Sequence, residues 1–489
     1  MKKILKRILC LSVAFVCMFG LVACKTPLSQ TTTDVSKTVY NGQNTNGGVT
    51  AVYNGYLYFI NGTKTNDGKS ATGNKKSAIC RVKIDEDGKI DDKSYEVVVD
   101  NLVGYTNGSI NFFGDFMYFT TPNDKVNNEN LKLNYQTNFM RYDLVNKKSY
   151  VLYTTSSNSS SASISYAYYV KDGLNLLVYE SANSKLTSLK IGDSVTTNYV
   201  IDSIKTCLFS ENYGKCVTEG QSVDANSFVY YTKDIDVYED GIASGTKIYK
   251  VSPTTKEDSV NIYKGENTVT LLTIKNGNLV YSSKGAYDDS TAIYYQMISA
   301  SKTEKLNFLK KISYTTYDNI IFVENENGTV AAISLNANTN DLLYLEADEN
   351  NNYEITPKTI YTLAGSTASS SSDDSTSSNL SLVSLETYTE GEDEVTYLIY
   401  IISNVVYKLE VMRNGYVSTE AEQIKLSKSN VSAPSGKLVP EVVGNYLYIF
   451  AKEVDDKNAE TSNIYLHRVN IVETTEDSTD YATIVAIKE

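Results

Sequence analysis

A single histidine, His467, limits the acid–base chemistry available to this chain of 489 residues. A hydrolytic triad with a histidine base would have to use it, and a metal centre built from several imidazoles is excluded. His467 occupies a repeated position that Cys80, Met140 or Tyr249 fills in other copies, so we expect an ordinary strand side chain. We therefore predict no catalytic, cofactor-binding or metal-ligating residue and expect no cofactor.

The cysteines are the next candidates for chemistry. Cys80, Cys207 and Cys216 remain once the N-terminal segment described below is set aside. Cys207 and Cys216 are separated by the turn-like stretch LFSENYGK, which makes a disulfide between them possible in an oxidising compartment. Three free thiols are the alternative. No pair has the CxxC spacing of a zinc site.

The N-terminus has the pattern of an export signal. Four basic residues within the first seven precede an apolar run over 8–21, which ends at Leu21-Val22-Ala23-Cys24. The run is too short for a membrane-spanning helix. The tetrapeptide resembles the lipobox of bacterial lipoproteins, and the resemblance implies that the Cys24 thiol is diacylated and that the chain is cut before it. An ordinary signal peptide with a chance cysteine is the alternative.

This pattern predicts three segments: a lipoprotein signal peptide over 1–23, a lipidated cysteine and flexible tether over 24–48, and a folded body over 49–489. The expected location is the extracellular face of a bacterial cell membrane, with contact to the membrane through the lipid anchor. The formal charge of −13 becomes −17 when the four basic residues of 1–23 are removed. Such a charge argues against a nucleic-acid partner and disfavours adhesion to anionic lipids or wall polymers by charge alone. We expect a monomer.

From residue 50 onward the chain repeats a turn of Gly, Asn or Asp followed by four or five apolar residues. Eight copies can be aligned, at spacings that average about 56 residues. The spacings before and after the sixth copy, 41 and 78, indicate that this copy is misaligned. The aligned positions are Tyr56, Phe116, Leu176, Phe228, Leu279, Ile320, Leu398 and Tyr446.

Two further strands follow most copies. One carries a basic residue within an apolar segment, as at Arg81, Arg141, Lys250, Lys408 and Arg468, and the next is β-branched, as over 95–100 and 195–201. No sustained helical periodicity follows residue 24. Three or four strands per repeat of this length are typical of a β-propeller, in which stacked sheets cover each other's faces. We predict an all-β chain with a single propeller of about eight, alternatively seven, four-stranded blades. A pair of β-sandwiches is the runner-up.

Three strand segments resemble degenerate YWTD repeats of low-density-lipoprotein-receptor-type propellers: Tyr58–Asn61, Tyr118–Thr121 and Tyr230–Lys233. The chain also resembles uncharacterised propeller lipoproteins of Gram-positive anaerobes and, more distantly, TolB-like propellers. Every Trp of the motif is replaced, and its Asp is absent from its place. The resemblance implies binding of a protein or other ligand on a propeller face and supplies no catalytic residues.

We therefore expect a binding or scaffolding lipoprotein that presents a propeller face to a protein or cell-envelope ligand. The alternative is a carbohydrate-processing enzyme with two or three carboxylates in the central funnel, which 58 Asp and Glu leave open. The acidic segment 85–92 is similar to a calcium loop but lacks its closing Glu, and we interpret it as an ordinary turn. Most of the 40 tyrosines lie within strand motifs, where packing is their expected role.

Overall fold

The computed structural model describes residues 50–60, 78–85, 90–100, 110–123, 135–157, 159, 163–170, 172–209, 228–235, 244–257, 259–275, 278–285, 291–297, 309–313, 320–324, 330–336, 341–345, 358–362, 380–390, 393–402, 405–412, 417, 420–424, 441–443, 446–454, 460–471 and 482–487. The segment that contains Cys24 lies outside this part, so the predicted lipid attachment stays a prediction.

The described strands form eight four-stranded antiparallel sheets, here called blades 1 to 8 in chain order. Blades 1 to 4 consist of β1 (Thr50–Tyr53), β2 (Tyr56–Ile60), β3 (Ile79–Ile84), β4 (Ile90–Val99); β5 (Asn111–Phe113), β6 (Phe116–Pro122), β7 (Thr137–Asp143), β8 (Lys148–Thr154); β9 (Ile164–Val170), β10 (Leu174–Glu180), β11 (Lys185–Ile191), β12 (Val195–Ile201); and β13 (Cys207–Phe209), β14 (Val229–Asp234), β15 (Thr246–Val251), β16 (Val260–Gly265).

Blades 5 to 8 consist of β17 (Thr268–Lys275), β18 (Asn278–Lys284), β19 (Thr291–Met297), β20 (Leu309–Ser313); β21 (Ile320–Glu324), β22 (Val330–Asn336), β23 (Asp341–Leu345), β24 (Lys358–Thr362); β25 (Leu380–Glu390), β26 (Asp393–Ile402), β27 (Val405–Glu410), β28 (Glu422–Ile424); and β29 (Glu441–Val443), β30 (Tyr446–Val454), β31 (Glu460–Asn470), β32 (Ala482–Ile487). The 3₁₀ turn η3 (Ser181–Asn183) links β10 to β11. No described helix is long and apolar enough to cross a membrane.

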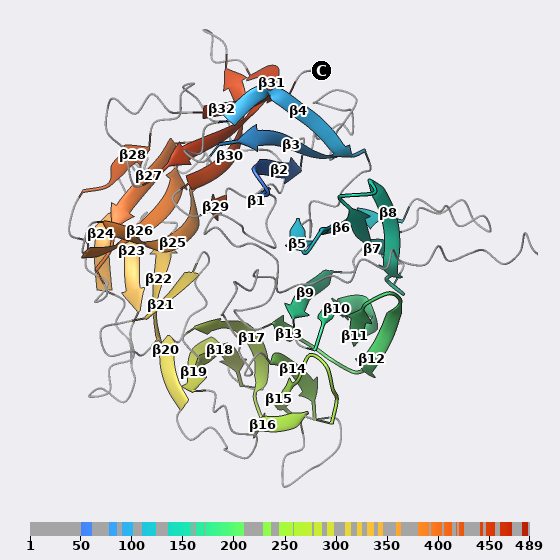
Figure 1. Ribbon diagram of the computed structural model, residues 1–489. Helices are drawn as coiled ribbons and strands as arrows, with labels where there is room; N and C mark the ends of the chain where they lie inside the picture. The colour runs from blue at the N-terminus through green and yellow to red at the C-terminus, as the bar shows by residue number, and fades with distance from the viewer. Residues whose placement is uncertain are drawn as a thin grey trace, which may run out of the picture.

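The blades follow one another around a ring, with the first strand of each blade towards the centre and the fourth towards the outside (Figure 1). The arrangement confirms the predicted all-β propeller class in place of the two sandwiches. Every blade is a continuous stretch of chain, and blade 8 meets blade 1 where β32 lies beside β4. Among the described strands, the ring therefore closes by packing of two sheets and not by exchange of a strand.

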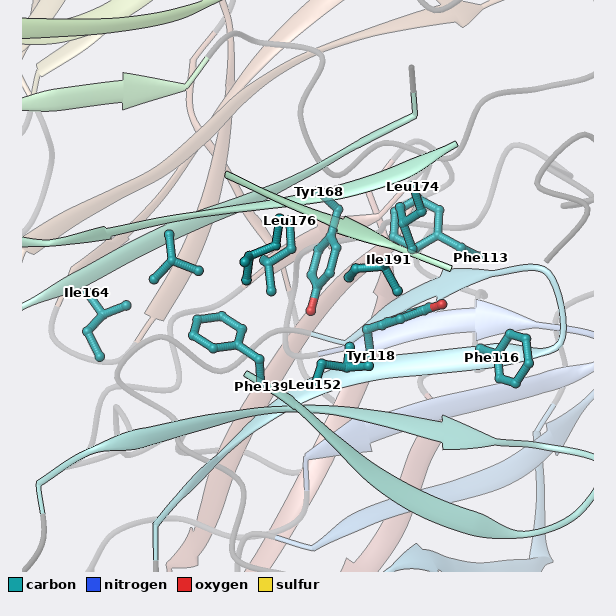
Figure 2. Close-up of a cluster of buried hydrophobic side chains, with 12 residues drawn as sticks. Phe113, Phe116, Tyr118, Phe139, Leu152, Ile164, Tyr168, Leu174, Leu176 and Ile191 are labelled. Atoms are coloured by element: carbon teal, nitrogen blue, oxygen red, sulfur yellow. The ribbon is translucent and has the colours of Figure 1, made fainter. Parts of the chain in front are cut away.

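Aromatic side chains fill the spaces between blades. Between blades 2 and 3, Tyr118 and Tyr168 are buried with ring centroids 5.4 Å apart, and Phe113 lies 5.6 Å from Tyr168 (Figure 2). These rings alternate along their strands with side chains directed to the opposite neighbour, as the two-residue period of a strand requires. The expected packing role of the strand tyrosines is confirmed for this cluster.

The sequence repeat needs one correction. Seven of its eight aligned positions lie in or next to the second strand of a blade, but Ile320 lies in β21, the first strand of blade 6. The second strand of that blade is β22, whose sequence VAAISLN follows Asn327-Gly328 but has no aromatic residue. The small Ala331 and Ala332 are fully buried there, so the second strand of this blade lacks the aromatic residue that marks the other copies.

Candidate functional site

A pocket of about 660 Å³ opens at one end of blade 1. It is lined by the β1–β2 turn, by the end of β3 and by the start of β4. The turn depends on Asn54 and Gly55, whose φ angles of 49° and 73° are those of a tight hairpin turn. The backbone N–H of Ile84 donates to the Gly55 carbonyl at 3.0 Å. This hydrogen bond holds the β1–β2 turn against the end of β3 at the pocket.

An irregularity in β4 shapes one wall. Arg81 pairs with Glu96 across the β3–β4 ladder, but Lys83 pairs with Asp91, so residues 92–95 form a bulge between these two backbone pairs. This bulge is fixed by Ser94, whose hydroxyl accepts a hydrogen bond from the Lys83 backbone N–H at 2.6 Å. Bulges of this kind bend a strand and redirect its side chains, and they occur often beside functional sites.

The lining combines an apolar floor with a charged rim. Ile84 is buried, and Ile90 and Tyr56 are half-buried. The rim consists of exposed side chains of both signs: Lys83, Asp85, Asp91 and Lys93. Ammonium groups donate and carboxylates accept hydrogen bonds, so this pocket can hold a ligand that has both kinds of polar group and one apolar face.

A network behind Tyr56 supports the floor. The Arg81 guanidinium lies 4.1 Å from the centre of the Tyr56 ring. Its Nε and Nη2 donate to Glu96 Oε2 at 2.9 and 2.7 Å, and its Nη1 donates to the Tyr58 hydroxyl at 3.0 Å. Burial raises the pKa of Tyr58, although the neighbouring Arg81 opposes the shift. Tyr56 is thus held from behind by a fully engaged cation.

The same contact explains the basic residue of the sequence repeat. Arg141 lies 4.3 Å from the Phe116 ring, Lys250 4.9 Å from Phe228, and Lys408 4.7 Å from Tyr397. In blades 1, 2, 4 and 7 the cation on the third strand therefore covers the aromatic residue that opens the apolar segment of the second strand, a cation–π arrangement.

Blade 1 differs from the others in exposure. Arg141, Lys250 and Lys408 are 2%, 2% and 5% exposed, whereas the Arg81 side chain is 20% exposed. The position that is sealed in the other three blades is therefore partly open in blade 1, next to the pocket. The sequence shows the repeated basic residue but not this difference in exposure.

A second polar cluster joins blades 2 and 3. Glu180, at the end of β10, is fully buried, and its carboxylate accepts hydrogen bonds from the Tyr153 hydroxyl, the Ser156 N–H and hydroxyl, and the Ser157 N–H, all at 2.8–2.9 Å. Lys185 Nζ lies 3.9 Å from it. Burial and the Glu180 charge raise the pKa of Tyr153 to about 12. Every oxygen of this carboxylate is used in holding the link between the blades, so we interpret the cluster as structural.

The residues predicted to carry chemistry are placed as follows. Cys24 and Cys216 lie outside the described part of the chain. Cys207 begins β13, and its strand pairs with β14, which starts at Val229. The disulfide with Cys216 stays a prediction. Burial raises the pKa of the Cys207 thiol, which disfavours the reactive thiolate.

His467 lies within β31, opposite Ile449 and Thr483 of the neighbouring strands. Asp85 and Asp91, from the segment that is similar to a calcium loop, are exposed residues of the pocket rim. Within the described ranges, no three side chains of His, Cys, Asp or Glu come together as a possible metal site.

The fold and the pocket define a β-propeller with a ligand-sized hollow at the end of one blade. No protein-family model and no curated protein sequence matches the chain. Among solved structures, it is similar to a puromycin-hydrolysing peptidase of Mycobacterium tuberculosis, with 6% identity and a TM-score of 0.39 over 75% of this chain and 52% of that one. It thus spans about half the length of that peptidase.

Two further solved structures match this chain over almost their whole length. A protein from Lactobacillus plantarum is similar with 10% identity and a TM-score of 0.37, over 86% of this chain and 93% of that one. The Dos1 propeller is similar with 10% identity and a TM-score of 0.38, over 84% and 91%. At these values the likeness concerns the fold, and no activity is carried over from these proteins.

Proposed function

We propose that the chain is an exported lipoprotein, anchored through Cys24, whose propeller binds a protein or cell-envelope ligand at the blade 1 end. The observation that carries the binding proposal is the pocket itself: an apolar floor of Tyr56, Ile84 and Ile90 under a rim of two cations and two anions. Pockets with an apolar lining and a few convergent polar groups are the usual ligand sites of proteins.

The anchoring proposal is supported by the basic, apolar and Leu-Val-Ala-Cys segments of residues 2–24. A diacylglycerol provides two acyl chains, which suffice for stable attachment where one chain would be marginal. The similarity of Tyr58–Asn61 and its two counterparts to YWTD repeats is consistent with ligand binding on a propeller face. The pocket and the resemblance point to the same kind of function, although neither names the ligand.

Two experiments test the two halves separately. Cys24→Ala is expected to abolish incorporation of labelled fatty acid and to release the protein from membranes or leave the uncut precursor. Equal labelling of parent and variant would refute the anchor. For the pocket, Lys83→Ala/Asp85→Ala is expected to abolish capture of a ligand from native cell envelopes, because both side chains are exposed on the rim.

The matched control is Lys190→Ala/Asp193→Ala, which removes the same two charges from exposed positions beside the β11–β12 hairpin of blade 3. This control should capture the ligand as the parent does. Loss of capture in both variants, or in neither, would refute a site in blade 1. Turnover of a captured glycan, lost on changing one acidic residue to its amide in a folded protein, would replace binding by the enzymatic alternative.

A further inference from the structure

Two of the repeated cations have an acid directly opposite them on the outer strand of their own blade. Arg81 pairs with Glu96 of β4, and its Nε and Nη2 both donate to Glu96 Oε2. Lys408 pairs with Glu422 of β28, whose Oε2 lies 3.3 Å from the Lys408 Nζ. In blades 1 and 7, therefore, the fourth strand supplies the negative charge that faces the cation of the third strand.

Blade 2 has the cation but not the acid. Arg141 of β7 pairs with Tyr150 of β8, so a phenol stands where blade 1 has Glu96. Arg141 is 2% exposed, and within the described part of the chain its Nε and Nη2 have no hydrogen-bond partner. These are the same two atoms with which Arg81 holds its carboxylate. The pair of donors on one side of the Arg141 guanidinium is thus buried and has no acceptor.

The acid on the same strand does not take the place of Glu96. Asp143 lies two residues further along β7, but its carboxylate belongs to the β7–β8 turn. It accepts hydrogen bonds from the backbone N–H groups of Val145 and Asn146 at 2.9 and 2.8 Å and from Asn146 Nδ2 at 2.8 Å. This carboxylate stabilises the turn, as Asp often does, and accepts nothing from Nε or Nη2 of Arg141.

Aromatic rings surround the Arg141 guanidinium. Its Cζ lies 4.3 Å from the centre of the Phe116 ring and 5.7 Å from that of Tyr150. Such contacts stabilise a desolvated cation in part, but they supply no oxygen for its N–H groups. A buried charge without a hydrogen-bonded partner is costly. An anion that accepts from both N–H groups removes this cost.

We propose that blade 2 binds a carboxylate at the position that Glu96 occupies in blade 1, with Arg141 donating through Nε and Nη2. The planar guanidinium matches a carboxylate with two parallel N–H groups. A carboxylate is also the group that the chain itself places against this cation in blades 1 and 7. It comes from a small organic acid or from an acidic side chain of a partner protein.

Tyr150 controls access to this site. β8 is the outer strand of blade 2 (Figure 1), and the Tyr150 side chain is half-buried there. Rotation of the side chain to another staggered position opens the way to Arg141 without a change in the strand. Lys148 is exposed two residues before Tyr150, on the same face of β8, and its positive charge attracts an anion to this place.

The carboxylate site is separate from the pocket of blade 1. The Phe116 ring, which Arg141 covers, belongs to the core between blades 2 and 3. The pocket is lined by residues of blade 1. Loss of one site therefore leaves the other in place, and the two proposals can fail independently.

The test is NMR of the purified full-length protein, in detergent, with ¹⁵N-labelled arginine. The chain has five arginines, so few side-chain Nε–H signals are present, and Arg141→Lys identifies the signal of Arg141 by its loss. Sodium acetate, exchanged for sodium chloride at constant ionic strength, should move this signal downfield to saturation. The Arg81 signal is the internal control and should stay in place, because its Nε already donates to Glu96 at 2.9 Å.

A second titration uses a blocked tripeptide with a central glutamate, acetyl-Gly-Glu-Gly-amide. A saturable shift with both probes supports an acidic side chain of a partner protein as the source of the carboxylate, and a shift with acetate alone supports a small organic acid. No saturable shift of the Arg141 signal with either probe would overturn the proposal. An equal shift with sodium chloride alone would also overturn it, since the site would then not select a carboxylate.

Tyr150→Glu supplies the carboxylate from the chain itself and repeats the arrangement of blade 1. Acetate binding should then weaken about tenfold, or about 1.4 kcal/mol, and the Arg141 signal should lie downfield before any acetate is added. The control Ser149→Glu adds the same charge at an exposed position on the other face of β8. It should bind acetate as the parent does and melt at a lower temperature than Tyr150→Glu. Equal weakening of acetate binding in both variants would contradict a site at Arg141. If Tyr150→Glu does not fold, the titrations of the parent decide alone.

Discussion

Replacing Glu180 tests whether the connection between blades 2 and 3 depends on one buried carboxylate. Glu180→Ala removes the acceptor of five hydrogen bonds, which come from Tyr153, Ser156, Ser157 and Asn183. Ser156 is exposed and can turn to water, but Ser157 is buried. A buried donor left without a partner costs about 1–3 kcal/mol, and removing one member of a buried charged network costs about 3–5 kcal/mol.

We therefore expect Glu180→Ala to lower the free energy of unfolding by about 3–5 kcal/mol. Glu180→Gln should cost less, about 1–2 kcal/mol, because its carbonyl oxygen can still accept the two backbone N–H groups that now share Oε2. Urea unfolding followed by far-UV circular dichroism measures both, since the chain has no Trp.

The control is Glu266→Ala, an exposed acid after β16, which should change stability by less than about 0.5 kcal/mol. A loss below about 1 kcal/mol in Glu180→Ala would contradict the reasoning, because it would mean that the freed donors find water at no cost. A loss in Glu180→Gln equal to that in Glu180→Ala would show that the negative charge matters and that the acceptor geometry does not.

Three further predictions concern the ring. Removal of 438–489 should lower the melting temperature of the whole propeller, because blades 1 and 7 each lose the sheet that covers one face; cooperative melting at the parental temperature would contradict this. Lys408→Met should lower the free energy of unfolding by about 1–3 kcal/mol, because the buried Lys408 Nζ donates to the Ile471 carbonyl of blade 8 at 2.9 Å. Unchanged urea unfolding would show that water replaces this donor. The contribution of Tyr153 to the free energy of unfolding should be complete below pH 10, the usual tyrosine pKa, and should fall between pH 10 and 12. The reason is that burial raises the pKa of Tyr153 to about 12 in the folded protein, so only the unfolded state ionises in that window. Tyr153→Phe should flatten this fall in urea unfolding at pH 9, 10 and 11.

The sequence predicts the outer three strands of a blade well. Tyr56, Arg81 and the segment 95–100 lie in β2, β3 and β4, because aromatic runs after Asn-Gly turns and β-branched runs are strong local signals. The inner strands are not predicted individually. Asn111–Phe113 and Glu441–Val443 are three residues long, too short to show a period, and their pairing is decided by the neighbouring strand.

The pocket could be predicted only in part. Asp85 and Asp91 attract attention as acidic turn residues, but the sequence offers no sign that residues 92–95 bulge from β4 or that Tyr56 forms a floor. Both depend on the register between Lys83 and Asp91, which is a long-range choice of the fold.

Closure of the ring without strand exchange bears on how the chain folds. Each blade can complete its hydrogen bonds as soon as its own segment of chain is available. Each of the first seven blades packs against the blade that follows it in the sequence. Most contacts are therefore local in sequence and form quickly. The packing of β32 against β4 is the one seam that must wait for the whole chain. The same contiguity means that new termini cut between any two blades, with the old ends joined, would leave every sheet intact, so circular permutation should preserve the fold.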